Sequence, residues 1–152
     1  MKEFQIKPIG YVERRSVDED DKDRSLISKI VIHESLTKAL EGIEDFSHIY
    51  IIFWMDKIKD TSYLHHPGKK LDSKPVGIFA TRAPIHPNPI GLTLVELIKR
   101  KKNVLWVKGL DAYDTTPVLD IKPYPDWERG ICITINDFRI PKWLKKNQNI
   151  NL

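Results

Sequence analysis

The chain has 152 residues, of which 41% are hydrophobic and 30% are charged, which is the composition of one folded domain and excludes a disordered chain. Its longest uninterrupted apolar run is the seven residues 49–55, too short for a transmembrane helix, so we expect a cytoplasmic protein without a membrane partner. The net charge of +4 is compatible with a polyanionic partner.

The first half of the chain predicts three strands and one short helix. Residues 4–12 alternate between apolar and polar, and Pro8 within them is typical of an edge strand or a bend. A second strand is expected at 27–33, followed by a short amphipathic helix at 34–41. The apolar run 49–55 predicts a fully buried strand, since it is too short for a stable helix.

The second half predicts further strands around a proline-rich loop. The expected strands are 76–80, 92–99, 104–110, 116–122 and 131–135, with Pro123 ending the fourth and Pro141 opening a short basic helix. We therefore predict a mainly β chain, a small single-domain β-barrel with short helices, because closing a sheet removes its exposed edges. The barrel is expected over residues 1–130, with 131–152 packed on the same domain.

The loop in residues 77–91 is the most informative stretch. Three prolines within residues 84–89 restrict the backbone, so this part can be neither helix nor central strand. Arg82, His86 and Asn88 place a fixed cation, a titratable ring and an amide in the same loop, the mixture that a polar ligand requires. The alternative is a plain proline-stiffened turn.

Two sequence blocks carry a family resemblance. Residues 77–92 read G-I-F-A-T-R-A-P-I-H-P-N-P-I-G-L, and residues 109–124 read G-L-D-A-Y-D-T-T-P-V-L-D-I-K-P-Y. These resemble the blocks G-V-F-A-T-R-S-P-x-R-P-N-P-I-G-L and G-L-D-x-x-D-G-T-P-V-L-D-I-K-P-Y of the TsaA-like family, the TrmO-type tRNA methyltransferases that use S-adenosylmethionine. P-I-G at 8–10 and L-E-G-I-E-D-F-S-H-I at 40–49 match in the same order. The resemblance covers about residues 4 to 125.

The resemblance implies a fold, a reaction and a set of contacts. It implies a small β-barrel that works as a homodimer and methylates the N6 amine of a threonylcarbamoyl-adenosine beside the anticodon of tRNA. It also implies an S-adenosylmethionine site unlike the Rossmann kind, which fits the absence of a G-x-G-x-x-G motif after a strand. Carried over by position, the cofactor contacts are Asp56, Lys57, Arg82, Leu92, Asp114, Thr115, Thr116 and Pro117.

The reaction needs an acceptor and a surface for RNA rather than a strong base, since the sulfonium of the cofactor is a strong electrophile. Asp114 is the candidate acceptor for an N–H of the adenine amine, and Tyr124 is a candidate to stack on the base. The substrate contacts that we expect are His86, Asn88, Lys101 and Lys102.

The chain departs from the family pattern at three positions: His86 replaces an arginine, Ala83 a serine and Thr115 a glycine. Because a β-branched residue disfavours positive φ, Thr115 predicts a turn that is not of the glycine-only type.

Two alternative functions remain at the level of the sequence. One is a non-catalytic small β-barrel that binds RNA through its lysine clusters. The other is a metal hydrolase built on His65 and His66, but no carboxylate or cysteine lies at ligand spacing from them, so we expect no metal.

Overall fold

The structure is a computed structural model that describes residues 3–14, 26–65 and 74–124. The strand expected at 131–135, the C-terminal helix and the boundary at residue 130 lie outside these residues. Within them, no helix is both long and apolar enough to cross a lipid bilayer.

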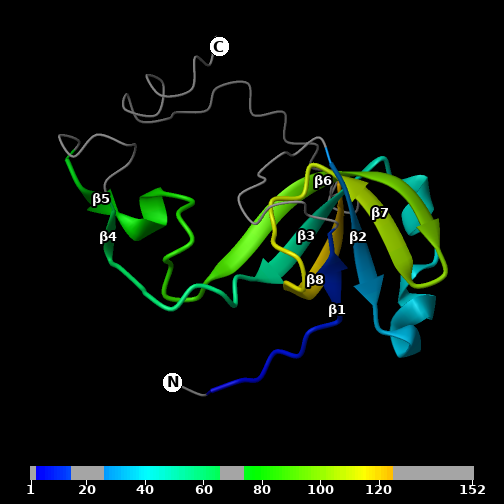
Figure 1. The fold of residues 1–152 in the computed structure, drawn as a ribbon, viewed down its shortest axis with the longest axis horizontal. Coiled ribbons are helices and arrows are strands. Elements are labelled where there is room, and N and C mark those ends of the chain that lie inside the picture. The colour runs from blue at the N-terminus through cyan, green and yellow to red at the C-terminus, as the bar shows by residue number, and fades with distance from the viewer. Residues whose placement is uncertain (1–2, 15–25, 66–73, 125–152) are drawn as a thin grey trace, which may run out of the picture.

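Six antiparallel strands close into a barrel in the order β1-β2-β7-β6-β3-β8 (Figure 1). They are β1 (Gly10–Glu13), β2 (Ile27–Ile32), β3 (His48–Trp54), β6 (Ile90–Lys101), β7 (Val104–Lys108) and β8 (Pro117–Tyr124). Two shorter strands, β4 (Leu64–His65) and β5 (Val76–Gly77), stand beside the barrel and, within the described part of the chain, pair only with each other. The predicted mainly β barrel is therefore confirmed.

The core is built from alternate residues of each barrel strand. On β3, Ile49, Ile51 and Phe53 are buried inside, while the side chains between them are only half-buried. The prediction of a strand buried on both faces is therefore wrong. A small barrel has one interior, and period-two alternation sends every second side chain outward, where Tyr50 and Ile52 give β3 an apolar outer face.

Three other predicted elements differ from the structure. The first strand begins at Gly10 rather than residue 4, after Pro8. The stretch 76–80 is a strand for only two residues and then turns into the 3-10 helix η3 (Ile78–Ala80). Strand β8 runs on through Pro123, which was expected to end it. Beyond Val118 the described part of β8 pairs with β3 alone, and proline is tolerated on a strand with an open edge.

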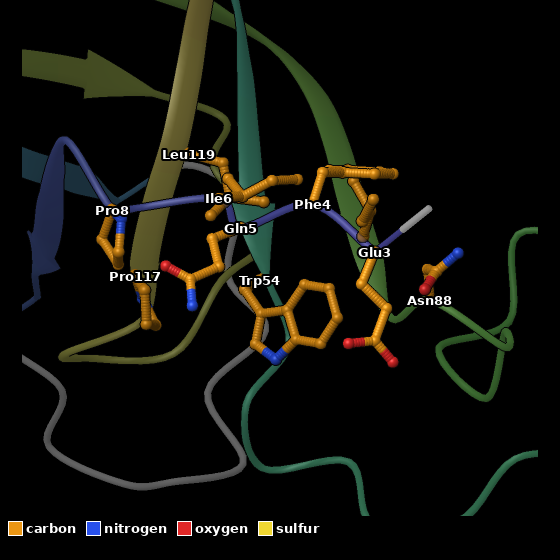
Figure 2. Close-up of a pocket in the computed structure, with 10 residues that line it drawn as sticks. Glu3, Phe4, Gln5, Ile6, Pro8, Trp54, Asn88, Pro117 and Leu119 are labelled. Atoms are coloured by element: carbon orange, nitrogen blue, oxygen red, sulfur yellow. The ribbon is translucent and has the colours of Figure 1, made fainter. Parts of the chain in front are cut away.

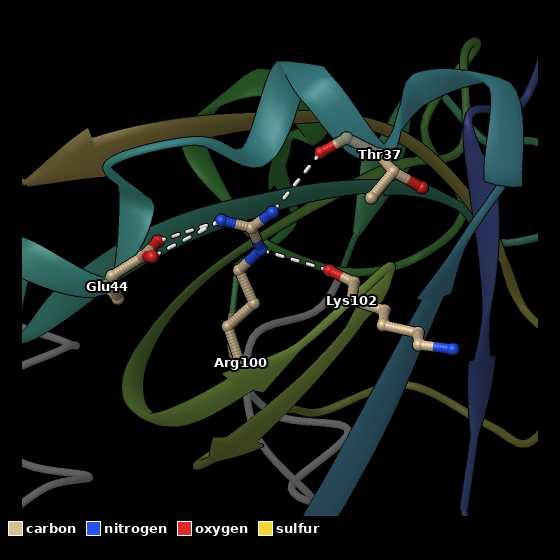
Figure 3. A network of polar contacts seen from close by, with 4 residues as sticks. All are labelled: Thr37, Glu44, Arg100 and Lys102. Carbon is tan, nitrogen blue, oxygen red and sulfur yellow. Dashed lines mark hydrogen bonds and ion pairs between the residues drawn. The ribbon is translucent and has the colours of Figure 1, made fainter.

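The segment between β2 and β3 forms two 3-10 helices, η1 (Glu34–Leu40) and η2 (Ile43–Asp45), where the sequence predicted a single amphipathic helix. Arg100 at the far end of β6 ties them to the β6–β7 turn (Figure 3). Its guanidinium donates to the carbonyl oxygen of Thr37 at 3.4 Å, to that of Lys102 at 3.0 Å and to the Glu44 carboxylate at 3.1 Å. The backbone N–H of Glu44 and the Arg100 guanidinium lower the pKa of the Glu44 carboxyl.

Candidate functional site

A cavity of about 250 Å³ opens at the end of the barrel where β3 ends and β6 begins. We call it the Arg82 pocket. It is lined by Arg14, Phe53, Met55, Asp56, Lys57, Ile58, Arg82, Pro84, Asp111, Ala112, Tyr113 and Thr116. Four of the eight residues that the resemblance placed at the cofactor line it directly: Asp56, Lys57, Arg82 and Thr116. These four come from three segments far apart in the sequence.

The first wall is the turn after β3. Asp56 and Lys57 follow the strand directly, and the Ile58 N–H donates to the carbonyl of Met55 at 3.1 Å. The N–H of Met55 donates to the carbonyl of Pro89 at 2.8 Å, so this turn is fastened to the proline loop. A barrel strand that carries charged residues at its end therefore delivers them to the pocket rim.

The second wall is the proline loop, which is irregular as predicted. Arg82 donates to the carbonyl of Leu92 on β6. The ring of His86 lies with Nε2 at 3.2 Å from the carbonyl of Thr81, and its centroid is 5.9 Å from that of Phe79. The loop is therefore held by its own side chains, and His86 serves in part to hold it.

The third wall is the loop before β8, which is bonded to β1. The backbone N–H of Arg14 donates to Asp114 Oδ1 at 2.7 Å. The N–H of Thr115 donates to the carbonyl of Val12 at 2.8 Å, and the Val12 N–H donates to that of Thr116 at 3.0 Å. Asp114, which is exposed and is not among the residues that line the pocket, therefore fixes the backbone of Arg14 in place.

Thr115 has φ of +65°, which lies in the left-handed region. The prediction that a β-branched residue would exclude this conformation is wrong. The hydrogen bonds to Val12 on both sides of the turn impose the glycine-like path, and threonine carries the strain that glycine would avoid.

The charges that line the pocket are mixed. Arg14, Lys57 and Arg82 supply cations, while Asp56 and Asp111 supply carboxylates. The Lys57 ammonium lies 4.8 Å from the centre of the Tyr113 ring, a cation–π distance. Together with the apolar walls, this lining suits a ligand that carries both signs of charge and a flat apolar part.

The other predicted residues lie elsewhere. The ring of Tyr124, at the far end of β8, packs edge-on against Tyr50 at 5.7 Å. Lys101 and Lys102 lie at the β6–β7 turn, separated from Ile90 by about 36 Å of strand at a rise of about 3.3 Å per residue. The structure therefore does not bring these three residues to the Arg82 pocket.

A second hollow lies between the N-terminal segment and the outer face of the barrel (Figure 2). It is larger, about 880 Å³, and Asn88 and Pro117 line it together with apolar side chains such as Phe4 and Trp54. Among the residues that the structure describes, the one charged residue that lines it is Glu3. The Arg82 pocket, which gathers five charged side chains, is the better candidate for polar chemistry despite its smaller volume.

Several residues of the pocket were not predicted. Asp111 and Tyr113 stand in the quoted G-L-D-A-Y-D block, and a candidate list that covered the whole block would have included them. Arg14 gave no signal, because it lies in a charged stretch and reaches the pocket only through the pairing of β1 with β2 and β8.

The fold and the site define a class: a small closed antiparallel barrel with a charged pocket at one end. The chain belongs to the tRNA-methyltransferase O N-terminal domain family, whose model matches residues 14–127. A crystal structure of TrmO from Pseudomonas aeruginosa superposes with a TM-score of 0.71 at 27% identity, over 94% of this chain and 62% of that one. The chain thus spans less than two thirds of that protein.

Curated relatives carry two kinds of name. An S-adenosyl-L-methionine-binding protein of Archaeoglobus fulgidus is 38% identical over 78% of this chain and 88% of its own length. A probable S-adenosyl-L-methionine-binding protein of Methanothermobacter thermautotrophicus is 40% identical over 80% of this chain and 90% of its own. The mouse tRNA (adenine(37)-N6)-methyltransferase is 42% identical over 57% of this chain but only 20% of its own length.

The strained turn gives a test of the pocket geometry. Thr115→Gly should be more stable than Thr115→Ala by about 1 kcal/mol, because glycine adopts positive φ without steric cost. Urea denaturation of both variants measures the difference. At the exposed Thr61, whose φ is not positive, the glycine variant should not be the more stable one. Equal stabilities at position 115 would contradict the left-handed turn.

Proposed function

We propose that this protein binds S-adenosylmethionine in the Arg82 pocket and transfers the methyl group to the N6 amine of an adenosine beside the anticodon of tRNA. The observation that carries the proposal is the convergence of Asp56, Lys57, Arg82 and Thr116 on one pocket in a chain of this family. The similarity to the mouse tRNA methyltransferase supports the proposed reaction. The similarity to the archaeal S-adenosyl-L-methionine-binding proteins supports the proposed cofactor.

The lining residues fit the chemical groups of the cofactor. The Arg82 guanidinium is suited to a carboxylate, and the Asp56 and Asp111 carboxylates are suited to an ammonium group or to ribose hydroxyls. Tyr113 and the apolar side chains beside it are suited to a flat purine ring. A zwitterionic nucleoside therefore matches both the mixed charge and the apolar walls of the pocket.

The protein's main task in the proposed reaction is to orient the reactants. When bound, S-adenosylmethionine supplies an electrophilic methyl group on a sulfonium. The pocket walls would orient the amine of the substrate toward the cofactor and exclude water, effects worth roughly 7–11 kcal/mol at best. Asp114 already accepts one hydrogen bond through Oδ1, which leaves Oδ2 as the proposed acceptor for the amine N–H. Asp111, which lines the pocket directly, is the alternative acceptor.

The substrate contacts follow from where the cations lie. His86 and Asn88, which lines the second hollow, stand on the proline loop that supplies Arg82 and Pro84 to the pocket, and they are the proposed contacts to the nucleotide that reacts. Lys101 and Lys102, at the other end of β6, would contact phosphates in a more distant part of the tRNA.

We further propose that the protein acts as a homodimer. At about 250 Å³, the Arg82 pocket formed by the described residues is smaller than the usual 300–1,000 Å³ of small-molecule sites, which leaves part of the ligand for a second copy to enclose in this proposal. The outer face of β6 exposes Ile90, Leu92 and Leu94, a short apolar stripe that contains the residue whose carbonyl Arg82 contacts, and the exposed Glu96 separates this stripe from Ile98. A second copy seated on this stripe would adjoin the pocket and complete it.

Light scattering at micromolar concentration tests the dimer. The wild-type chain should be dimeric, and Leu94→Glu should shift it to monomer, because a carboxylate would replace an exposed leucine in the interface. Ile27→Glu is the matched control, since Ile27 is also exposed but lies on β2, two strands away from β6. A wild-type monomer that binds the cofactor fully would refute the dimer.

Arg82 gives the sharpest test of the cofactor site. Arg82→Ala should weaken S-adenosylmethionine binding by about 10-fold or more, since a hydrogen-bonded ion pair to the carboxylate is lost. Isothermal titration measures the affinity, and a thermal unfolding scan checks that the barrel survives. Lys74→Ala, a charge removal outside the lining, serves as control. If the wild-type protein binds no S-adenosylmethionine, the non-catalytic RNA-binding barrel becomes the better reading.

The acceptor is tested with radiolabelled S-adenosylmethionine and total tRNA from cells with and without the threonylcarbamoyl modification. We expect label only in the modified tRNA, and nucleoside mass spectrometry should locate it on N6. Label in both samples would mean that His86, in place of the family arginine, goes with a broader acceptor choice. Label in neither would contradict the proposed reaction.

A further inference from the structure

The β4–β5 ribbon, residues 62–65 and 74–80, stands apart from the barrel and exposes two aromatic rings. Tyr63 is 79% exposed and Phe79 is 80% exposed. Isolated exposed apolar residues are ordinary on protein surfaces. Two aromatic rings on one projecting element beside a functional pocket call for an explanation.

The exposure of Phe79 is set by the backbone around it. Ile78 next to it is only 2% exposed, and its N–H donates to the carbonyl of Tyr63 at 2.9 Å. The N–H and the hydroxyl of Thr81 both donate to the carbonyl of Ile78, at 3.0 and 2.8 Å. Because Ile78 is buried and hydrogen-bonded, the Phe79 side chain next to it points outward. The hydrogen bond from the Ile78 N–H to the Tyr63 carbonyl also joins the two exposed aromatic residues.

The ribbon is joined to the pocket wall. The N–H of Ser62 at its base donates to the carbonyl of Ile85 at 3.1 Å, in the proline loop that also supplies Arg82 and Pro84 to the pocket. On the other side, the Phe79 ring lies against the His86 ring of the same loop. The two exposed aromatic residues and the pocket therefore belong to one continuous structure, and Figure 1 shows the ribbon itself beside the barrel.

The charges around the ribbon favour a polyanion. Residues 56–65 and 74–86 contain the cations Lys57, Lys59, Lys74 and Arg82 against the two carboxylates of Asp56 and Asp60. Among the described residues, Lys59 and Lys74 form no ion pair. Exposed aromatic rings flanked by cations are the pattern with which proteins bind single-stranded nucleic acid. The apolar stripe suited to a protein partner lies instead on the first half of β6, at Ile90, Leu92 and Leu94.

We propose that Tyr63 and Phe79 form a stacking platform for unpaired bases of the RNA loop that presents the substrate adenosine. This inference rests on the proposed function for the identity of the RNA. The platform would hold bases next to the reacting one, so that the adenosine itself enters the Arg82 pocket. A loop with unstacked bases fits this geometry, whereas a continuous duplex offers no base faces.

A coupling experiment tests the platform. The probe is a synthetic RNA stem-loop with a dye on the stem and single abasic nucleotides placed in turn through the unpaired loop. Fluorescence anisotropy gives the affinity of wild-type protein, Tyr63→Ala and Phe79→Ala for each RNA. Each alanine variant should bind the intact loop about 5- to 150-fold more weakly. An RNA that lacks the stacked base should bind the wild-type protein more weakly than the intact loop does. Replacing the ring that stacks on this base by alanine should then cause no further loss of affinity for that RNA.

Three further variants separate stacking from other roles. Phe79→Trp should keep the affinity and Phe79→Leu should lose it, because leucine offers apolar area without an aromatic face. Phe4→Ala removes an equally exposed ring, 83% exposed, from the N-terminal segment and should leave the affinity unchanged. The salt dependence should be the same for Phe79→Ala and wild type, since no phosphate contact is removed.

The outcomes separate this inference from the proposed function. If the wild-type protein binds S-adenosylmethionine but Phe79→Ala keeps its RNA affinity, the platform is refuted and the proposed function stands. If the cofactor does not bind but the abasic coupling appears, the platform stands and the proposed function fails. The platform is also refuted if Phe79→Leu binds the RNA like the wild-type protein, or if the wild-type protein does not bind the stem-loop. Dissociation of a dimer by Phe79→Ala would refute it too, because the ring would then contact a second copy of the chain.

Discussion

The closure of the barrel at β1 is the constraint on which the rest of the structure depends. This four-residue strand pairs with β2 on one side and β8 on the other. The seam is so close at Gly10 that a Cβ atom there would lie 2.2 Å from the carbonyl oxygen of Val31. Val12 on the same strand accepts a hydrogen bond from Thr115 and donates one to Thr116. The strand that closes the barrel thus also shapes one wall of the pocket.

The pocket combines the ends of barrel strands with loops that are bonded to each other. The Phe53 ring packs over Gly91, where any Cβ atom would meet the ring at 2.2 Å, and Phe53 also lines the pocket. The proline loop and the turn after β3 are joined by the bond between Met55 and Pro89. Rigid walls of this kind suit a reaction in which orientation of the reactants supplies most of the acceleration.

The outside of the barrel carries two different kinds of surface. The first half of β6 exposes a short apolar stripe on its outer face, where we propose that a second copy of the chain docks, while the β4–β5 ribbon presents separate rings among cations, where we propose that RNA binds. At the far end, Arg100 is committed to Glu44 and to two backbone carbonyls. Arg100 therefore stabilises the fold, while the three lysines of the basic run 99–102 remain exposed.

The sequence by itself determined the barrel class and most strand positions, because these follow from local periodicity. Proline geometry predicted the irregular loop, and the family resemblance pointed to cofactor contacts of which half line the Arg82 pocket. Only the tertiary structure decided what depends on pairing between distant segments. Arg14 reaches the pocket through β1, and Thr115 takes positive φ because bonds to Val12 outweigh its side-chain preference. Strand ends also decided that Tyr124, Lys101 and Lys102 lie far from the Arg82 pocket, since a position along a strand fixes which end of a barrel a residue occupies.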